Sequence, residues 1–370
     1  MLDNLGKLVT FPGDHIPDLP FWSLIAASLV LSFLIVWVGV PSVVRMARIK
    51  NLYGEPGERD SHTIPTPRLG GTMVFAGVVF STVLFTGFGT DNKLKYIIAS
   101  MIVLFFIGVK DDVVSLSPIK KAIGQLLAAL IVVVAADLRV TCCYGLFGID
   151  ELPWLPGVIL TTAGIIFIVN SFNFIDGIDG LASGIGLTGS AAMGLWFIYL
   201  GDISYGVMAF SLCGALAAFF WFNAYSKEYK SFLGDTGSMI IGFLLSLFVL
   251  RYLEIVNEQH QFDPLLATSP SVALSVLFIP LFDAVRICFV RIRRGRSIFM
   301  ADSNHIHHKV LLLTRSHMKS TYGIVGVNLL FLVVSSLFVS VSNWVLIPLI
   351  VLFSISAILL VEMRVNGEGR

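Results

Sequence analysis

The polar residues best suited to chemistry follow a long apolar run, Leu155 to Val169. The sequence continues as Asn170-Ser-Phe-Asn173-Phe-Ile-Asp176-Gly-Ile-Asp179-Gly, so an amide or a carboxylate recurs at every third position. On a helix, or on a 3₁₀-like helix end, this spacing keeps successive side chains on neighbouring parts of one face. Such oxygen atoms can coordinate a hard cation or bind a nucleoside, and a self-satisfied capping network is the alternative.

A pair of carboxylates, Asp111 and Asp112, lies directly after another apolar run and is followed by Lys121. Neighbouring helical residues point about 100° apart, so the two aspartates should not share one role. We expect one to face a metal or a nucleophile while the other takes a lysine or backbone amides. Two solvated acids at a helix end are the alternative interpretation.

Asp235 stands between two glycines, Gly234 and Gly237, just before an apolar run, and Lys230 precedes it. An aspartate in this place can simply be the N-cap of the following helix, which is worth about 1 kcal/mol. The flanking glycines favour a second interpretation, in which the backbone closely approaches a ligand.

Arginines and histidines gather in two further loops. They are Arg59, His62 and Arg68 in a proline-rich loop, and Arg294 and Arg296 ahead of His305, His307 and His308. Zinc is not favoured, because no cysteine is close and the other available ligands are hard oxygens. Arginine forks and histidine donors fit a phosphate or diphosphate, whereas snorkelling arginines on an anionic membrane surface are the alternative.

The composition indicates an all-α polytopic membrane protein formed by a single domain over residues 1–370, because 56% of the residues are hydrophobic and 13% are charged. Apolar runs near the length needed to cross a bilayer predict about eleven spans. They lie near 22–44, 70–89, 95–109, 121–136, 155–172, 184–200, 203–222, 237–253, 271–290, 322–341 and 344–362.

The basic residues predict the orientation of these spans. One set of alternate loops holds 20 of the 25 lysines and arginines. By the positive-inside rule this set is cytoplasmic, which puts the N-terminus outside and the C-terminus in the cytoplasm. The predicted cytoplasmic loops are about 45–69, 110–121, 173–183, 223–236 and 291–320, and every polar motif described above lies within or beside one of them, on the cytoplasmic side.

Together the motifs resemble the polyprenyl-phosphate N-acetylhexosamine-1-phosphate transferases, the glycosyltransferase 4 or MraY-WecA-TagO superfamily, and within it the WecA/TagO-like branch. The matching pieces are Pro56-x-x-Arg59-x-x-His62 with Pro67-Arg68-Leu-Gly-Gly, Asp111-Asp112 with Lys121 and Gln125, Asn170-x-x-Asn173-x-x-Asp176-Gly-x-Asp179, Phe232-Leu-Gly-Asp235-x-Gly-Ser238, and Arg294-Gly-Arg296 ahead of Asp302-x-x-His305-Ile-His307-His308. Asn223 lies farther before Asp235 than in the MraY-like branch, so its role is not carried over.

The resemblance implies transfer of N-acetylglucosamine 1-phosphate from UDP-GlcNAc to undecaprenyl phosphate, with release of UMP and with Mg²⁺ or Mn²⁺ as cofactor. It also implies a bacterial inner-membrane protein whose active site faces the cytoplasm, a possible homodimer and no nucleic-acid partner. By this resemblance the catalytic residues are Asp111, Asp112, Lys121 and Asp176, and the metal ligands are Asp235 and Asn173. The substrate-binding residues are Asp179, Arg59, His62, Arg68, Lys230, Arg294, Arg296, His305, His307 and His308.

Two other functions are weighed against this one. Within the enzyme class the alternatives are an MraY-like transferase acting on UDP-MurNAc-pentapeptide and a transferase that uses another UDP-HexNAc donor. The His-Ile-His-His pattern resembles the WecA/TagO branch, which favours UDP-GlcNAc. A secondary transporter is the alternative from another class, because polytopic bundles with carboxylates are typical of transporters. Transporter carboxylates usually lie near mid-membrane, whereas these fall at the predicted ends of spans.

Overall fold

The computed structural model describes residues 8–9, 19–50, 52, 66–87, 93–142, 151–259, 269–295, 304–338 and 341–368. Two short strands, β1 (Leu8–Val9) and β2 (Leu19–Pro20), pair antiparallel before the first helix. The rest of the named elements are helices. They are α1 (Phe21–Ile49), α2 (Gly70–Phe85), α3 (Lys93–Val114), α4 (Pro118–Leu130) with the π-helical segment η2 (Ile131–Ala135), α5 (Trp154–Ile175), α6 (Leu181–Leu200), α7 (Ile203–Ala224), α8 (Gly234–Gln259), α9 (Ser269–Arg293), α10 (Ile306–Thr314), α11 (His317–Leu337) and α12 (Asn343–Glu368).

The helices confirm the prediction of an all-α polytopic membrane protein. Each of the eleven predicted spans coincides with a helix, and α4 and η2 together form one of them. Within the described ranges, nine helices are long and apolar enough to cross a membrane, while α2 is shorter and α3 carries charged residues at both ends. The count of eleven and the orientation of the termini stay predictions. The short helix α10 is an addition inside the predicted loop 291–320.

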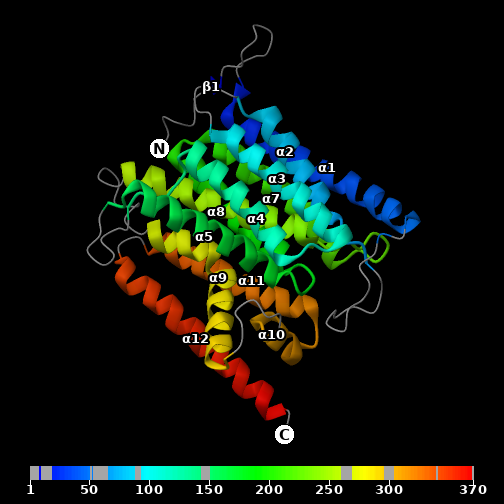
Figure 1. Ribbon diagram of the computed structural model, residues 1–370, viewed down its shortest axis with the longest axis vertical. Helices are drawn as coiled ribbons and strands as arrows, with labels where there is room; N and C mark the ends of the chain where they lie inside the picture. Colours follow the sequence, from blue (N-terminus) through cyan, green and yellow to red (C-terminus); the bar gives the residue numbers. More distant parts are fainter. Residues whose placement is uncertain are drawn as a thin grey trace.

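Helix α8 forms the centre of the bundle. It contacts α2, α3, α5, α6 and α9, and its residues from Met239 to Leu245 are almost wholly buried. Figure 1 shows α8 in the interior, while α12 runs along the edge and carries the C-terminus away. Small residues allow this close packing: a Cβ atom at Gly242 would lie only 2.9 Å from the Cα atom of Val169 in α5. Helix α8 therefore packs with its backbone close to that of α5 at this point.

Glycines on α2 and α3 bring two further backbones against the start of α8. A Cβ atom at Gly71 would lie 2.3 Å from the main-chain nitrogen of Gly237, and one at Gly108 would lie 2.5 Å from the Cα atom of Thr236. Larger residues at these positions would push the helices apart. The spacing of the helices thus depends on glycine where the polar motifs meet.

Candidate active site

The N-terminus of α8 is capped by a carboxylate from another helix. Asp112, near the end of α3, accepts hydrogen bonds from the main-chain N–H of Asp235 at 2.7 Å and from that of Thr236 at 3.0 Å. It also accepts one from the Thr236 hydroxyl at 2.6 Å. The interpretation of Asp235 as the N-cap of this helix is therefore wrong, because Asp112 already binds the free N–H groups of the first turn.

The loop before α2 is paired with the segment that leads into α8. The N–H groups of Gly70 and Gly71 donate to the carbonyls of Phe232 and Leu233, at 3.1 and 3.0 Å, and the N–H of Phe232 donates to the carbonyl of Pro67 at 2.8 Å. These bonds fix the start of α2 against the start of α8. Two segments that are about 160 positions apart in the sequence thereby meet beside the polar motifs.

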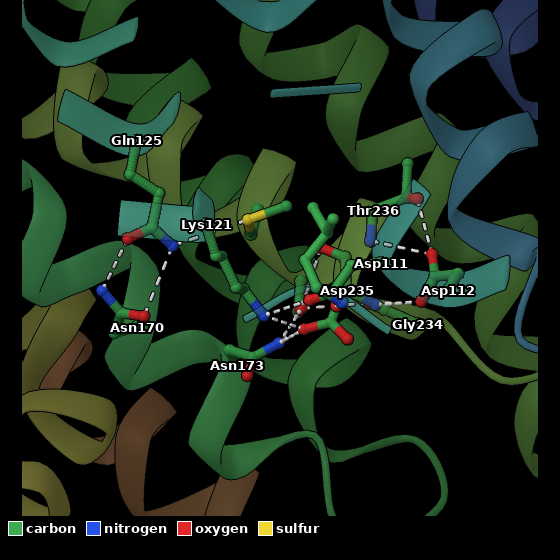
Figure 2. A network of polar contacts seen from close by, with 12 residues as sticks. Asp111, Asp112, Lys121, Gln125, Asn170, Asn173, Gly234, Asp235 and Thr236 are labelled. Atoms are coloured by element: carbon green, nitrogen blue, oxygen red, sulfur yellow. Dashed lines mark hydrogen bonds and ion pairs between the residues drawn. The ribbon is translucent and has the colours of Figure 1, made fainter. Parts of the chain in front are cut away.

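The Asp235 carboxylate lies at the centre of a polar cluster (Figure 2). It forms an ion pair with Lys121 of α4 and accepts a hydrogen bond from the Asn173 amide of α5. Lys121 also lies 3.1 Å from the Asp111 carboxylate of α3, and Asn173 donates to the Ser238 hydroxyl at 3.0 Å. The structure thus brings together predicted residues from α3, α4, α5 and α8.

The neighbouring carboxylates Asp111 and Asp112 face different partners, as expected for adjacent helical positions. One Asp111 oxygen accepts from the N–H of Leu116 at 2.6 Å, and the other faces Lys121. Both Asp112 oxygens bind the first turn of α8. Asp111 thus holds the lysine of the cluster, while Asp112 holds the backbone that carries Asp235.

The turn after α5, residues 176–180, is fixed mainly through Asp179. The Lys230 ammonium lies 2.7 Å from the Asp179 carboxylate, which also lies 3.7 Å from the His317 ring. The Thr321 hydroxyl donates to the Asp179 carbonyl at 2.6 Å. A loop and helix α11 therefore hold the turn in place.

Asn223, for which no role was carried over, takes part in this arrangement. Its amide oxygen accepts from the N–H of Gly180 at 2.5 Å, and its amide nitrogen donates to the carbonyl of Ser231 at 2.9 Å. Gly180 has a φ of +78°, a conformation that glycine adopts at little cost. Asn223 thus connects the 176–180 turn to the segment leading into α8.

Asn170, the first residue of the sequence motif, points to a different partner. It forms a reciprocal amide pair with Gln125 of α4, with donor–acceptor distances of 2.9 and 3.3 Å (Figure 2). The pair joins α4 to α5 one turn below Asn173. Asn170 therefore supports the helices that carry the cluster.

Negative charge is concentrated at this end of the bundle. The pKa of Asp176 is raised well above its usual range by burial and by the nearby carboxylates of Asp235, Asp112 and Asp179, and the Arg68 charge opposes this shift. Burial is also the largest cause that raises the pKa of Asp112, to about 7, and the Asp235 charge adds to it. Clustered carboxylates that resist ionisation favour the binding of a cation.

The histidine motif packs against the 176–180 turn. His307 is 2% exposed, and neither ring nitrogen has a hydrogen-bond partner in the described part of the chain. A Cβ atom at Gly177 would lie 2.3 Å from His307 Nε2, and the His307 ring lies 5.5 Å from that of His305 and 4.2 Å from that of His308. Burial lowers the pKa of His307 to about 3, so the ring is neutral at physiological pH. A buried imidazole in this state suits a ligand contact.

Hard oxygen atoms at Asp235 fit magnesium better than zinc. The Asp235 side chain is 29% exposed, against 10% for Asp111, so it is the more accessible of the two to a bound ion. No group of three histidines, cysteines or acids arranged to hold a metal occurs in the described ranges. Mg²⁺ needs no such group, because it keeps several waters and binds through one or two carboxylates together with substrate phosphates.

For four predicted arginine and histidine positions, a place in this cluster stays a prediction. Arg59, His62 and Arg296 lie outside the described residues. Arg294 is exposed at the end of α9, and its side chain makes no polar contact with any described residue. Their predicted role in binding substrate stays a prediction.

Several contacting residues were missed by sequence reasoning. They are Thr236 at the α8 cap, Asn223, and His317 and Thr321 at the 176–180 turn. Each reaches its partner from a distant segment, so no local spacing could have indicated the contact. The motif Phe232-Leu-Gly-Asp235-x-Gly-Ser238 spans Thr236 but specifies no residue type at that position, so it indicated no role for Thr236.

Comparison with known proteins places the chain in a family of membrane transferases. Residues 94–253 match the sequence profile described as "Glycosyl transferase family 4". This range runs from α3 into α8 and includes the cluster around Asp235. With the relatives described next, it shows that the chain belongs to glycosyl transferase family 4.

The similar curated proteins share one activity in their names. The "Decaprenyl-phosphate N-acetylglucosaminephosphotransferase" of Mycobacterium tuberculosis is 33% identical over 285 residues, 71% of this chain and 70% of the relative. The "Undecaprenyl-phosphate alpha-N-acetylglucosaminyl 1-phosphate transferase" of Salmonella typhi is 33% identical over 273 residues, 73% of this chain and 72% of the relative. The enzyme of that name from Escherichia coli (strain K12) is 31% identical over 270 residues, covering 72% and 71%. The resemblance drawn from the motifs is confirmed.

Proposed function

We propose that the chain transfers N-acetylglucosamine 1-phosphate from UDP-GlcNAc to a polyprenyl phosphate. An oxygen of the lipid phosphate bonds to the β-phosphorus of the donor, and the bond from that phosphorus to the bridging oxygen breaks. UMP leaves with the bridging oxygen, and polyprenyl-diphospho-GlcNAc remains in the membrane. The observation that carries this proposal is the convergence of Asp111, Lys121, Asn173 and Asp235, with the 176–180 turn beside them, in a chain of this family.

The reaction joins two polyanions, so its first requirement is neutralisation of charge. Lys121 lies between the carboxylates of Asp111 and Asp235 and can turn toward a phosphate once a metal ion binds Asp235. Arg68 lies close enough to Asp176 for its charge to oppose the rise in the pKa of that carboxyl. We assign these two cations to the region where the diphosphate of the donor and the phosphate of the acceptor meet.

The 176–180 turn is the nucleotide side of this site. Asp179 is held by Lys230, and His307 packs against Gly177 with ring nitrogens that bind no other described residue. Hydrogen-bonding groups at a fixed turn can bind a uridine and the phosphate attached to it. We assign Asp179, Lys230 and the histidines His305, His307 and His308 to donor binding.

Asp235 would hold Mg²⁺ or Mn²⁺, with Asn173 as a second ligand after its amide turns, because its nitrogen now faces Asp235. The bound ion would neutralise the diphosphate and help UMP to leave. Asp112 fixes the position of Asp235 by accepting a hydrogen bond from its main-chain N–H. Asp176 interacts electrostatically with Asp235, so its carboxylate would also attract the ion.

The Asp111 carboxylate positions Lys121 in this account. A phosphomonoester has its second pKa near 6, so at neutral pH the acceptor is mostly dianionic and needs little help from a base. Both Asp111 oxygens already have partners, Leu116 and Lys121. This arrangement favours positioning over proton removal or covalent attack.

The location of the site suits its two substrates. The donor is soluble and the acceptor is a membrane lipid, so a site at the ends of the spans can meet both. The distribution of basic residues supports a cytoplasmic location for this end, and the family resemblance supports a bacterial inner membrane. Undecaprenyl phosphate is the acceptor we propose, and a homodimer is the assembly suggested by the family resemblance.

Parallel donor assays test this function. Purified protein with undecaprenyl phosphate and Mg²⁺ would be offered UDP-GlcNAc, UDP-GalNAc and UDP-MurNAc-pentapeptide, and UMP release would be measured. We expect UMP release to be fastest with UDP-GlcNAc and to stop when EDTA is added. Faster turnover of UDP-MurNAc-pentapeptide would favour the MraY-like alternative. Absence of UMP with all three donors would contradict the enzyme and would leave the transporter as the better account.

A further inference from the structure

A buried carboxylate, Asp283, lies within the membrane helix α9 and belongs to none of the motifs described above. Its residue is only 1% exposed. Burial of an ionised carboxylate costs several kcal/mol unless partners compensate for the lost water. Ionisable residues inside membrane spans are therefore expected to serve a purpose, with a nearby partner.

The partners of Asp283 lie at the start of the histidine motif. One carboxylate oxygen lies 2.8 Å from Nδ1 of His305. The other accepts from the N–H of Ile306, the first residue of α10, at 3.1 Å, and from Arg286 at 2.9 Å. His305 stands at the N-cap position of α10, but its own side chain makes no capping bond. Asp283 thus binds a ring and caps a helix at once.

The oriented ring faces the nucleotide side of the site. His305 packs on Phe174 in the last turn of α5, with ring centroids 5.7 Å apart, and stacks on His307 at 5.5 Å. His307 in turn lies against Gly177. Because Nδ1 of His305 is engaged by Asp283, Nε2 is the ring nitrogen left to bind a ligand.

We infer that Asp283 is a positioning residue for donor binding: it holds His305 through Nδ1 so that Nε2 faces the diphosphate of the UDP-sugar. This inference rests on the proposed function. Further contacts hold the start of α10 in place. Arg286 also donates to the carbonyl of Asn304 and lies 3.8 Å from Glu362 of α12. Glu362 in turn pairs with Lys309 of α10. Different oxygens of Asp283 bind the His305 ring and the N–H of Ile306, so the two roles can be tested separately.

The Ile306→Pro substitution separates the two roles. Proline lacks the N–H that Asp283 binds, and it is well tolerated at the first position of a helix. His305 has φ −62° and ψ 152°, which is the conformation favoured before proline. The variant therefore loses the cap bond and keeps the bond between Asp283 and His305.

Direct binding of UDP-GlcNAc to purified protein, measured by calorimetry without the lipid acceptor, tests the inference. We expect Asp283→Asn to weaken binding about tenfold, as for the loss of a charged hydrogen bond, and Ile306→Pro to change it less than about twofold. Asp283→Asn combined with His305→Ala should bind no more weakly than His305→Ala alone, because both changes remove one function. Wild-type protein that fails to bind UDP-GlcNAc would contradict the proposed function itself.

Three results would overturn the inference while wild-type binding stays intact. They are unchanged affinity in Asp283→Asn, equal weakening in Ile306→Pro, and additive weakening in the double variant. Asp202→Asn is the matched control, because Asp202 also caps a helix, α7, and pairs with an arginine, Arg251, away from the site. It should lower the melting temperature and leave the affinity unchanged.

A measurement on the unchanged protein covers the case in which Asp283→Asn does not fold. Nitrogen-15 spectra of histidine-labelled wild-type protein in lipid, recorded where His305 is neutral, should show its proton on Nδ1. The His305→Ala variant assigns the signal. A proton on Nε2 instead would overturn the inference.

Discussion

The two ends of helix α8 carry polar clusters of opposite character. Asp235 lies in the first turn of α8, whereas Arg251 and Glu254 lie near its other end, about 24 Å away at 1.5 Å per residue. At the far end Arg251 binds Asp202 and Glu254, both at 2.8 Å, and Lys93 lies 2.6 Å from Glu254. Each charge there has an opposite partner.

At the Asp235 end, acidic side chains outnumber lysines and arginines among the described residues. The acids are Asp111, Asp112, Asp176, Asp179 and Asp235, and the lysines and arginines in contact with them or close to them are Lys121, Lys230 and Arg68. In the cluster around Arg251 the ion pairs need no added ion, so they can stabilise the bundle as they stand. Among the described residues, the cluster around Asp235 has an excess of carboxylates, which favours the binding of an added cation such as the metal ion we propose.

The largest effect is expected from Asp235→Asn. This change removes the proposed metal ligand and should lower kcat at least about 100-fold, comparable to the loss of one strong transition-state contact. Stability should stay equal or rise, because repulsion among the carboxylates falls. UMP release and thermal unfolding of the same preparation would measure both. Asp202→Asn should lower the melting temperature and leave kcat unchanged. Equal loss of activity in both variants would contradict the distinction between the two ends of α8.

A smaller loss is expected from Asp112→Ala. The variant leaves the first N–H groups of α8 without their cap, so Asp235 loses its fixed place. We expect kcat to fall roughly tenfold and the melting temperature to fall as well, since a lost cap costs about 1 kcal/mol. Unchanged kcat with a lowered melting temperature would reduce Asp112 to a structural role.

A division of labour is expected between Asp179 and Asn173. Asp179→Ala should raise the dissociation constant of UDP-GlcNAc about tenfold, because the turn loses its bond to Lys230. Asn173→Ala should instead raise the Mg²⁺ concentration needed for half-maximal rate. Binding and metal titrations on both variants would test this. Equal, unselective loss of both properties would refute the division.

The affinity of the cluster around Asp235 for Mg²⁺ is expected to depend moderately on pH. The pKa of Asp176 is raised and that of Asp112 reaches about 7, so protons compete with Mg²⁺ at neutral pH. Raising the pH removes these protons, so Mg²⁺ affinity should increase several-fold between pH 6 and pH 8. Calorimetric titrations at three pH values would show it. Affinity that falls with rising pH would contradict the sign.

Sequence reasoning succeeded where a pattern is local. Apolar runs located the helices, and adjacent helical positions already separated the roles of Asp111 and Asp112. It failed for contacts between distant segments, such as the cap that Asp112 supplies to α8 and the bonds of Asn223. Asp235 looked like an N-cap because its own neighbours gave no sign that a residue 123 positions earlier would fill that role. Asp283 was missed because a single acid in an apolar run has no spacing to interpret.

The dependence of UDP-GlcNAc binding on Mg²⁺ tests the central claim most directly. Calorimetry on wild-type protein and on Asp235→Asn, each with Mg²⁺ and with EDTA, needs neither lipid acceptor nor turnover. The charge imbalance at the Asp235 end predicts that Mg²⁺ tightens binding at least about tenfold in the wild type and hardly at all in the variant. Equal affinity with and without Mg²⁺ in the wild type, or an intact Mg²⁺ effect in Asp235→Asn, would contradict it.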